Sequence, residues 1–171
     1  MSLLISEYDP HWPDRFRAEK RVLTQALGEF ARAVEHVGST AVPGLAAKSV
    51  IDILVGVDDI ADIDRREAAM AQAGYEAKGE NGIPGRRYFR RWGPSGERLV
   101  HVHAFAMESE DFSRHLAFRD YLRAHPGRAA AYGALKQALV REEGISRARY
   151  AAGKAGLVAE LEAEARAWRR R

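Results

Sequence analysis

The stretch HVGSTAVPGLAAKSVIDILV, residues 36–55, joins a turn of small residues to a hydrophobic run that carries one carboxylate. The Gly38-Ser39-Thr40 corner offers backbone N–H groups, two hydroxyls and a position without a Cβ, so a phosphate can approach the main chain closely. Lys48 adds a positive charge nearby. Asp52 lies inside the apolar run, where a lone acid is costly unless it faces a cleft, a cation or water. The stretch therefore combines a phosphate-site pattern with a metal-site pattern.

Each of these features has an ordinary structural explanation. A Gly-Ser pair alone more often marks a simple turn between two strands, and Pro43-Gly44 is a second turn signal. A single aspartate can mark the rim of a strand. The glycine, the hydroxyls, the lysine and the aspartate together favour a binding site over a plain turn.

The sequence on either side of this stretch predicts a sheet followed by helices. Runs of strands followed by runs of helices are typical of α+β folds, and a chain of 171 residues with 46% apolar content can bury one core. We therefore expect a single domain, with a sheet part over residues 1–108 and a helical part over 109–171. Apolar spacing and turn residues predict helices at 9–27, 58–73, 111–124, 127–142 and 147–169, and strands at 33–37, 50–57, near 75, 86–92 and 99–105. The last two strands, separated by Gly93-Pro94-Ser95-Gly96, are predicted to form a hairpin.

Composition excludes several classes of protein. The chain has no cysteine, so disulfides and thiolate metal sites are excluded. It has no apolar run long enough to span a bilayer and no secretory signal layout at its start, so we expect a cytoplasmic protein without a membrane partner. A net charge of +3, much of it from clustered arginines, suits a phosphorylated small molecule or RNA.

Two histidines extend the candidate site. In a strand over residues 99–105, His101 and His103 point to the same face, because side chains alternate with a period of two. Two histidines on one strand face are more often a polar surface or a hydrogen-bonded pair than a metal site. His36, two residues before Gly38, is a further candidate for the rim of the site. His115 is expected to be an ordinary residue on a helix face.

The run from Arg86 to Trp92 alternates cations with aromatic residues. One interpretation is phosphate contacts from arginines such as Arg87 beside a surface on which a base stacks. The other is an exposed edge strand protected by charge. In a regular strand at most half of these cations can face one ligand.

Further motifs accompany residues 36–55: Tyr8-Asp9-Pro10-His11-Trp12 with Phe16, Arg87-Tyr88-Phe89-Arg90, Leu99-Val100-His101-Val102-His103, Phe118-Arg119-Asp120-Tyr121-Leu122-Arg123, His125-Pro126, Tyr132 with Lys136, and Tyr150 with Lys154. As a set, these motifs resemble the GrpB family, also called UPF0157, a branch of the nucleotidyltransferase superfamily. The resemblance covers nearly the whole chain and implies a nucleotidyltransferase-like twisted mixed sheet with flanking helices and a helical C-terminal part. It supplies no substrate.

The resemblance implies that Lys136, Tyr150 and Lys154 contact phosphate and close over the sheet. Without it, each would be an ordinary surface residue of an amphipathic helix. Gly38, Ser39, Thr40, Lys48 and Arg87 complete the predicted binding set.

The resemblance also implies divalent metal on strand carboxylates, with Asp52 as the principal ligand. Leu54 stands where a second acid is expected, and His101 and His103 stand where a third is expected. Mg²⁺ prefers hard oxygen ligands, whereas imidazole together with carboxylate suits Zn²⁺, Mn²⁺, Fe²⁺ or Ni²⁺. Either Asp52, His101 and His103 hold one metal, or the histidines act in acid–base chemistry and phosphate binding, or the transferase chemistry has been lost.

The sequence leaves two main functions open. The first is a metal-dependent nucleotidyltransferase, which binds a nucleoside triphosphate or another phosphorylated metabolite at the Gly-Ser turn and transfers a nucleotidyl group to an unknown acceptor. The alternative is a non-catalytic module linked to coenzyme A metabolism, because the resembling domain occurs fused to dephospho-CoA kinase. RNA binding through the arginine-rich strand is a third, less favoured hypothesis. The pattern does not determine the oligomeric state.

Overall fold

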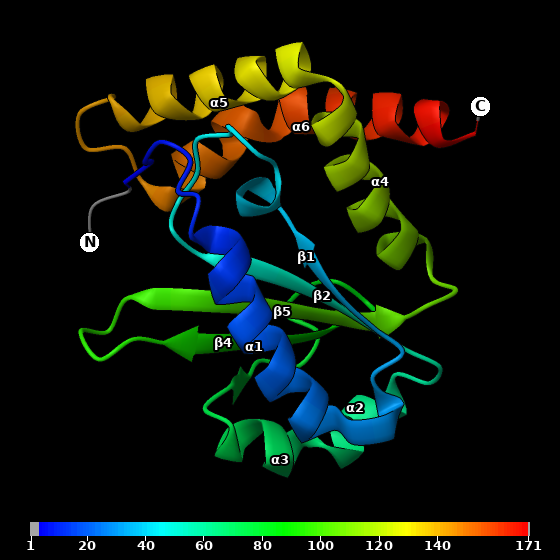
Figure 1. Cartoon of the computed structure of the whole chain (residues 1–171). Helices are drawn as coiled ribbons and strands as arrows, with labels where there is room; N and C mark the ends of the chain where they lie inside the picture. Colours follow the sequence, from blue (N-terminus) through cyan, green and yellow to red (C-terminus); the bar gives the residue numbers. More distant parts are fainter. Residues whose placement is uncertain (1–3, 171) are drawn as a thin grey trace.

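A five-stranded mixed sheet forms the centre of the molecule, with helices on both of its faces (Figure 1). The computed structural model describes residues 4–170. The strands lie in the order β1-β2-β5-β4-β3. The predicted α+β class is confirmed. The strands are β1 (Ala33–Val37), β2 (Ile51–Val57), β3 (Glu76–Ala77), β4 (Arg87–Trp92) and β5 (Arg98–Ala106), and the helices are α1 (Trp12–Leu27), α2 (Ala61–Arg65), α3 (Glu67–Gln72), α4 (Glu110–Ala124), α5 (Pro126–Val140) and α6 (Arg147–Arg169), with short 3-10 turns at Gly28–Phe30 and Ser39–Ala41.

The pairing of the strands makes the sheet mixed. β1 pairs antiparallel with β2, and β4 pairs antiparallel with both β3 and β5, which confirms the predicted hairpin between β4 and β5. β2 and β5 are parallel neighbours. Parallel strands need a long crossover, and here the chain makes it through α2, α3, β3 and β4.

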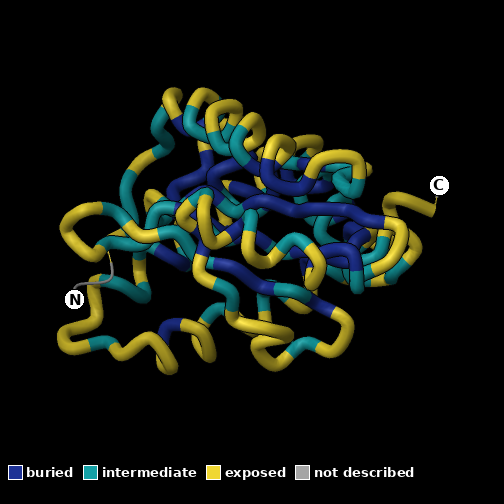
Figure 2. The backbone as a smooth tube through the Cα atoms, turned by 90° about the horizontal axis from the view of Figure 1, so that it is seen from below, coloured by how far each residue is buried: buried dark blue, intermediate teal, exposed yellow. Residues whose placement is uncertain are grey.

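One face of the sheet packs against α1 and α3 to form the main core. Ile53, Val55 and Val102 are completely buried there and lie against Leu23 and Leu27 of α1. These strand residues alternate with the residues of the opposite face, as a half-covered sheet requires. Seen from below, the buried segments run through the centre while the loops around them are exposed (Figure 2).

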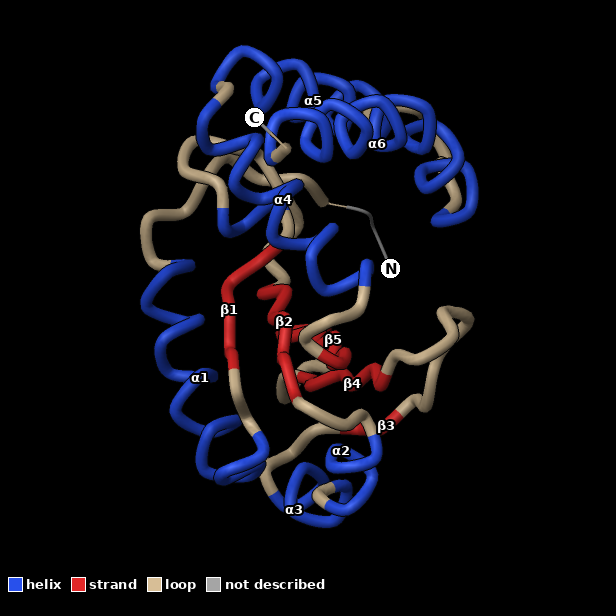
Figure 3. Tube along the Cα trace, turned by 90° about the vertical axis from the view of Figure 1, so that its right-hand side faces the viewer, coloured by secondary structure: helices blue, strands red, loops and turns tan. Residues whose placement is uncertain are grey.

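The opposite face is covered unevenly by the C-terminal helices. α4 packs on one end of this face, where Phe112 contacts Leu54 and Phe105. Gly56 permits this approach, since a Cβ at that position would lie 2.7 Å from the Phe112 ring. α5 and α6 stack farther out (Figure 3). Within residues 4–170, the helices are too short or too polar to span a bilayer.

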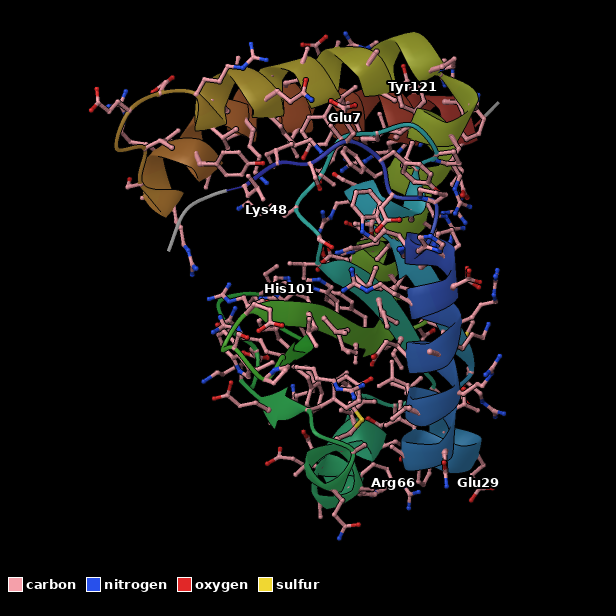
Figure 4. All side chains as sticks on the ribbon, turned by 60° about the vertical axis from the view of Figure 1, so that its left-hand side comes forward. Glu7, Glu29, Lys48, Arg66, His101 and Tyr121 are labelled. Carbon is pink, nitrogen blue, oxygen red and sulfur yellow. The ribbon has the colours of Figure 1, made fainter. Side chains whose placement is uncertain are left out.

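The helix predicted over residues 58–73 is two helices rather than one. α2 and α3 are separated at Arg66, whose φ of −103° and ψ of 5° are not helical. The Arg66 side chain donates to the carbonyl of Ala26 near the end of α1 at 2.9 Å (Figure 4). This long-range contact accompanies a break that local residue preference does not predict.

Candidate functional site

Asp52 and two histidines meet on the sheet face that α5 and α6 overhang. The parallel register of β2 and β5 sets Asp52 opposite His101, and alternation brings His103 to the same face. One Asp52 carboxylate oxygen lies 3.3 Å from His101 Nδ1 and 3.3 Å from His103 Nε2. Burial raises the pKa of Asp52, but its hydrogen bonds with the two imidazoles outweigh this and hold the pKa well below its ordinary value. Asp52 is therefore an ionised acid between two imidazoles.

Three further residues surround His103, and the sequence did not assign them to the site. Tyr88 of β4 lies opposite His103, with ring centroids 5.3 Å apart. Arg86 stacks on the Tyr88 ring at 4.9 Å. His115 of α4 lies 5.4 Å from His103, and its burial lowers its pKa to about 4. The alternation of residues 86–92 placed Tyr88 on one face, but only the pairing of β4 with β5 shows that this is the histidine face.

The glycine turn lies directly against Asp52. Gly38 has a φ of +71°, and a Cβ there would lie 2.7 Å from an Asp52 carboxylate oxygen. Only glycine combines this left-handed backbone with so close an approach. The Thr40 hydroxyl is engaged by His36 Nε2 at 2.8 Å, so it does not point freely toward a ligand.

His36 does not lie at the rim of the site. It pairs with Ile53 in the sheet register and therefore faces α1, where it stacks on Phe16 with a centroid distance of 4.9 Å. It is 6% exposed, and its burial lowers its pKa to about 4. His36 is a neutral, packed residue that holds the turn from beneath.

A cavity of about 250 Å³ opens above Asp52 and gathers most of the predicted binding residues. Lys136 of α5 donates to Ser39 Oγ at 2.8 Å. The ammonium groups of Lys48 and Lys154 lie 4.2 Å and 5.0 Å from the centre of the Tyr150 ring. The cavity is lined by Ser39, Thr40, Ala47, Lys48, Val50, Asp52, His101, Tyr132, Lys136, Tyr150 and Lys154.

The three lysines of this cavity, Lys48, Lys136 and Lys154, are called the lysine cluster below. Burial lowers the pKa of Lys136 to about 7, with a further contribution from repulsion by Lys154 and Lys48. Burial and the same kind of repulsion lower the pKa of Lys48 to about 8. Among residues 4–170, the only lysine paired with a carboxylate is Lys78, with Glu76. The lysine cluster is thus a concentration of positive charge near one acid, Asp52.

Arg87 lies away from this group, and its predicted place in the site is corrected. In the register of β4 with β5, Arg87 pairs with Ala104, which lies on the face of the sheet that packs against α1. Its guanidinium holds Asp64 of α2 through two hydrogen bonds of 2.6 and 2.8 Å. Arg86 and Arg90 are the arginines of this run that approach the histidine face, where both lie on the ring of Tyr88.

The predicted metal set does not form a cage of three protein ligands. In the described part of the chain, no group of three or more His, Cys, Asp or Glu residues is arranged to hold a metal ion. Leu54 is completely buried against Phe112, so position 54 contributes packing to the sheet rather than a second carboxylate. Neither a two-metal site nor an imidazole-rich zinc site fits this donor set.

Comparison with protein families identifies one model that matches residues 2–164, described as "GrpB protein". The UPF0157 protein YqkA of Bacillus subtilis (strain 168) is 39% identical over 163 residues, which are 95% of this chain and 47% of YqkA. A dephospho-CoA kinase of Mycolicibacterium paratuberculosis (strain ATCC BAA-968 / K-10) is 30% identical over 154 residues, which are 75% of this chain and 37% of that protein. The chain thus spans about half of YqkA and a smaller part of the kinase.

Solved structures agree with the family match and extend the fold comparison. The crystal structure of the conserved protein GrpB from Enterococcus faecalis matches with a TM-score of 0.89 and 42% identity over 95% of this chain and 96% of that one. The Cid1 poly(U) polymerase with MgGTP bound matches with a TM-score of 0.53 and 16% identity over 80% of this chain and 43% of that one. At this identity the second match establishes the likeness of fold alone.

Proposed function

The chain belongs to the GrpB family, and from that premise and the geometry of the site we propose that it binds a nucleotide or another phosphorylated metabolite in the cavity between the Gly38 turn and α5 and α6. The observation that carries the proposal is the lysine cluster. Lys136 is only 2% exposed, yet its ammonium has a serine hydroxyl rather than a carboxylate as its hydrogen-bond partner. A phosphate is the chemical group that this arrangement fits best.

The electrostatics of the lysine cluster support an anionic ligand. Burying an ammonium without a partner anion is costly, and neighbouring ammonium groups add repulsion. A phosphate supplies two negative charges and several hydrogen-bond acceptors, which offset both costs. Ser39 Oγ, Lys136 and Lys154 would bind its oxygens, and Lys48, which like Lys154 lies on the Tyr150 ring, would add a further positive charge. Thr40 would contribute only its backbone, since His36 holds its hydroxyl.

The more specific function that we propose is nucleotidyl transfer. The close approach of Gly38 to Asp52 favours it, because it places a carboxylate beside the turn that would bind the phosphates. Mg²⁺ is usually bound by one or two carboxylates together with substrate phosphates. Asp52 is one such carboxylate, so a Mg²⁺ or Mn²⁺ ion would arrive with the nucleotide and use Asp52 as its protein ligand. Such an ion supplies charge neutralisation and alignment of the phosphates. For this function, His101 and His103 would orient Asp52 and would exchange a proton with the hydroxyl of the acceptor.

The alternative is a non-catalytic module that binds a phosphometabolite. The absence of a second carboxylate at Leu54 favours it, because a likeness of fold does not confer a reaction. The similarity to part of a dephospho-CoA kinase makes coenzyme A precursors reasonable ligands to include.

Ligand binding measured by calorimetry and thermal unfolding tests the proposal. Inorganic tripolyphosphate, ATP and dephospho-CoA are titrated in chelator and in Mg²⁺ or Mn²⁺, with wild type, Lys136→Gln and Asp52→Asn. We expect phosphate compounds to bind wild type and to stabilise it by about 2.7 kcal/mol at a concentration of 100 Kd. Lys136→Gln should weaken binding about 10- to 100-fold. If no phosphate compound binds wild type, the proposal is refuted.

The same titrations separate the two finer candidates. For a transferase, metal should tighten nucleotide binding to wild type, and Asp52→Asn should abolish that gain. For a binding module, affinity in chelator should equal affinity in metal. Asp52→Asn should then leave affinity unchanged or improve it, since it removes a negative charge near the phosphates.

A further inference from the structure

A second and larger cleft adjoins the lysine cluster. It has a volume of about 750 Å³ and lies between α1, the beginning of β5 and α6. It shares Lys48, His101, Tyr150 and Lys154 with the inner cavity. Figure 4 shows Lys48 and His101 on opposite sides of this space, one beneath α6 and the other on the sheet. The two spaces therefore adjoin and share part of their lining.

The inner cavity is too small for a whole nucleotide. Sites for small-molecule ligands have volumes of roughly 300–1,000 Å³, whereas the inner cavity has about 250 Å³. It accommodates phosphates rather than a complete nucleoside. The rest of the ligand must then extend into an adjoining space. A cavity of about 330 Å³ beside His103 is one such space, but its arginine, Arg114, is paired with Asp111 and Glu162. The larger outer cleft contains Arg98, and its charged groups decide what the ligand can carry there.

Arg98, the first residue of β5, supplies an uncompensated positive charge to the outer cleft. Its Nε atom is buried without a hydrogen-bond partner. Its guanidinium lies 5.3 Å from the centre of the Trp92 ring, which fixes its position without neutralising its charge. Arg98 forms no ion pair within residues 4–170, whereas nine other arginines do.

The neighbours of Arg98 increase the positive charge. Burial lowers the pKa of Arg98, and repulsion from Arg90 and Arg147 lowers it further. Arg98 in turn contributes to the lowered pKa of Lys48. Arg90 also has a buried Nε without a hydrogen-bond partner, and it stacks on Tyr88 at 5.2 Å.

The acids that line the outer cleft do not neutralise Arg98. Glu19 accepts two hydrogen bonds from Arg91 on the other face of the sheet, at 2.7 and 2.8 Å. Glu97 accepts from the backbone N–H of Ser95 at 3.0 Å, within its own hairpin. His101 also lines this cleft, and its Nε2 atom is buried without a hydrogen-bond partner.

We propose that the outer cleft binds a second phosphate group through Arg98 and Lys48, so that the ligand carries phosphates at two separated positions. This inference rests on the proposed function, because the first phosphates lie in the lysine cluster. The ligand class is a nucleoside bearing phosphates on both sides of its ribose, or the phosphodiester at the end of a short RNA. Each of these ligands can place one anionic group in each space. A simple nucleoside diphosphate cannot, because its phosphates are attached at a single position of the ribose.

Paired ligands and paired variants test this inference. ADP and adenosine 3′-phosphate 5′-diphosphate, which differ by one phosphate, are titrated by calorimetry into wild type, Arg98→Gln and Lys136→Gln. We expect the added phosphate to tighten binding to wild type about tenfold or more. Arg98→Gln should reduce that gain to less than about twofold while leaving ADP affinity nearly unchanged. Lys136→Gln should weaken both ligands equally and keep the gain.

Arg21→Gln is the matched control, because Arg21 is exposed on α1 and the substitution removes the same charge. It should leave the gain intact. Arg98→Gln is expected to fold, since it removes repulsion. Lys48 lines both spaces, so Lys48→Gln should weaken ADP binding as well as reduce the gain from the added phosphate. A short single-stranded RNA, titrated in parallel, distinguishes a phosphodiester source from a small bisphosphate.

The outcomes distinguish failure of this inference from failure of the proposed function. If tripolyphosphate and both nucleotides fail to bind wild type, the proposed function fails and this inference fails with it. If ADP binds but the added phosphate brings no gain with either the nucleotide or RNA, the second subsite is overturned alone. A gain that persists in both Arg98→Gln and Lys48→Gln would also overturn it.

Discussion

Replacing Lys136 with methionine should stabilise the ligand-free protein while it weakens ligand binding. Methionine has a length similar to that of lysine and fills the same buried space without the charge. The Lys136 side chain is 2% exposed and donates to Ser39 at 2.8 Å. A substitution that removes a structural contact destabilises a protein, whereas one that removes a buried, repelled charge does the opposite.

The magnitude follows from the lowered pKa of Lys136. Its pKa falls from 10.5 to about 7, and each unit corresponds to about 1.4 kcal/mol, so the ammonium costs the folded state several kcal/mol at neutral pH. Losing the hydrogen bond to Ser39 lowers the stability of the variant by about 1 kcal/mol. Allowing for relaxation around the charge, we expect the free energy of unfolding to rise by about 1–3 kcal/mol. Each kcal/mol raises the Tm of a chain of this length by roughly 2–4 °C.

Chemical denaturation of both proteins, with and without tripolyphosphate, measures this effect. The unfolded chain binds more protons than the folded one between pH 7 and 10.5, so the stability of wild type rises with pH through this window. The advantage of Lys136→Met should therefore shrink as the pH is raised toward 10. A variant less stable than wild type at neutral pH would refute the reasoning, because Lys136 would then be a structural residue.

Three other predictions follow from the structure. Gly38→Ala places a Cβ against Asp52 at a φ of +71° and should lower the free energy of unfolding by about 1–3 kcal/mol, measured by urea denaturation; an unchanged midpoint would contradict the close approach. Burial lowers the pKa of His36 and His115 to about 4, so the unfolded chain binds more protons below pH 6.5 and stability should decline from about pH 6.5 to pH 4; the double variant with glutamine should decline less. Arg87→Gln should leave the affinity for tripolyphosphate unchanged, because Arg87 lies on the other face of the sheet, and a loss of affinity by calorimetry would restore it to the site.

The sequence by itself determined most of the secondary structure and singled out most of the residues that line the cavity above Asp52. Glycine and proline turns and the periods of 3.6 and 2 are local signals, so strand β1, the hairpin of β4 with β5 and the three C-terminal helices were predicted within a few residues. The shared face of His101 and His103 follows from alternation alone. The fold class follows from the order of these elements.

Only the tertiary structure decided which of these residues meet. Whether Asp52 lies opposite His101 depends on the register of two strands that are not adjacent in the sequence. The register of β4 with β5 placed Arg87 on the α1 face of the sheet and Tyr88 on the face of the two histidines. Lys136 reaches Ser39 across 97 residues of sequence, because α5 docks above the sheet. Such contacts arise from packing between distant elements, which no local pattern encodes.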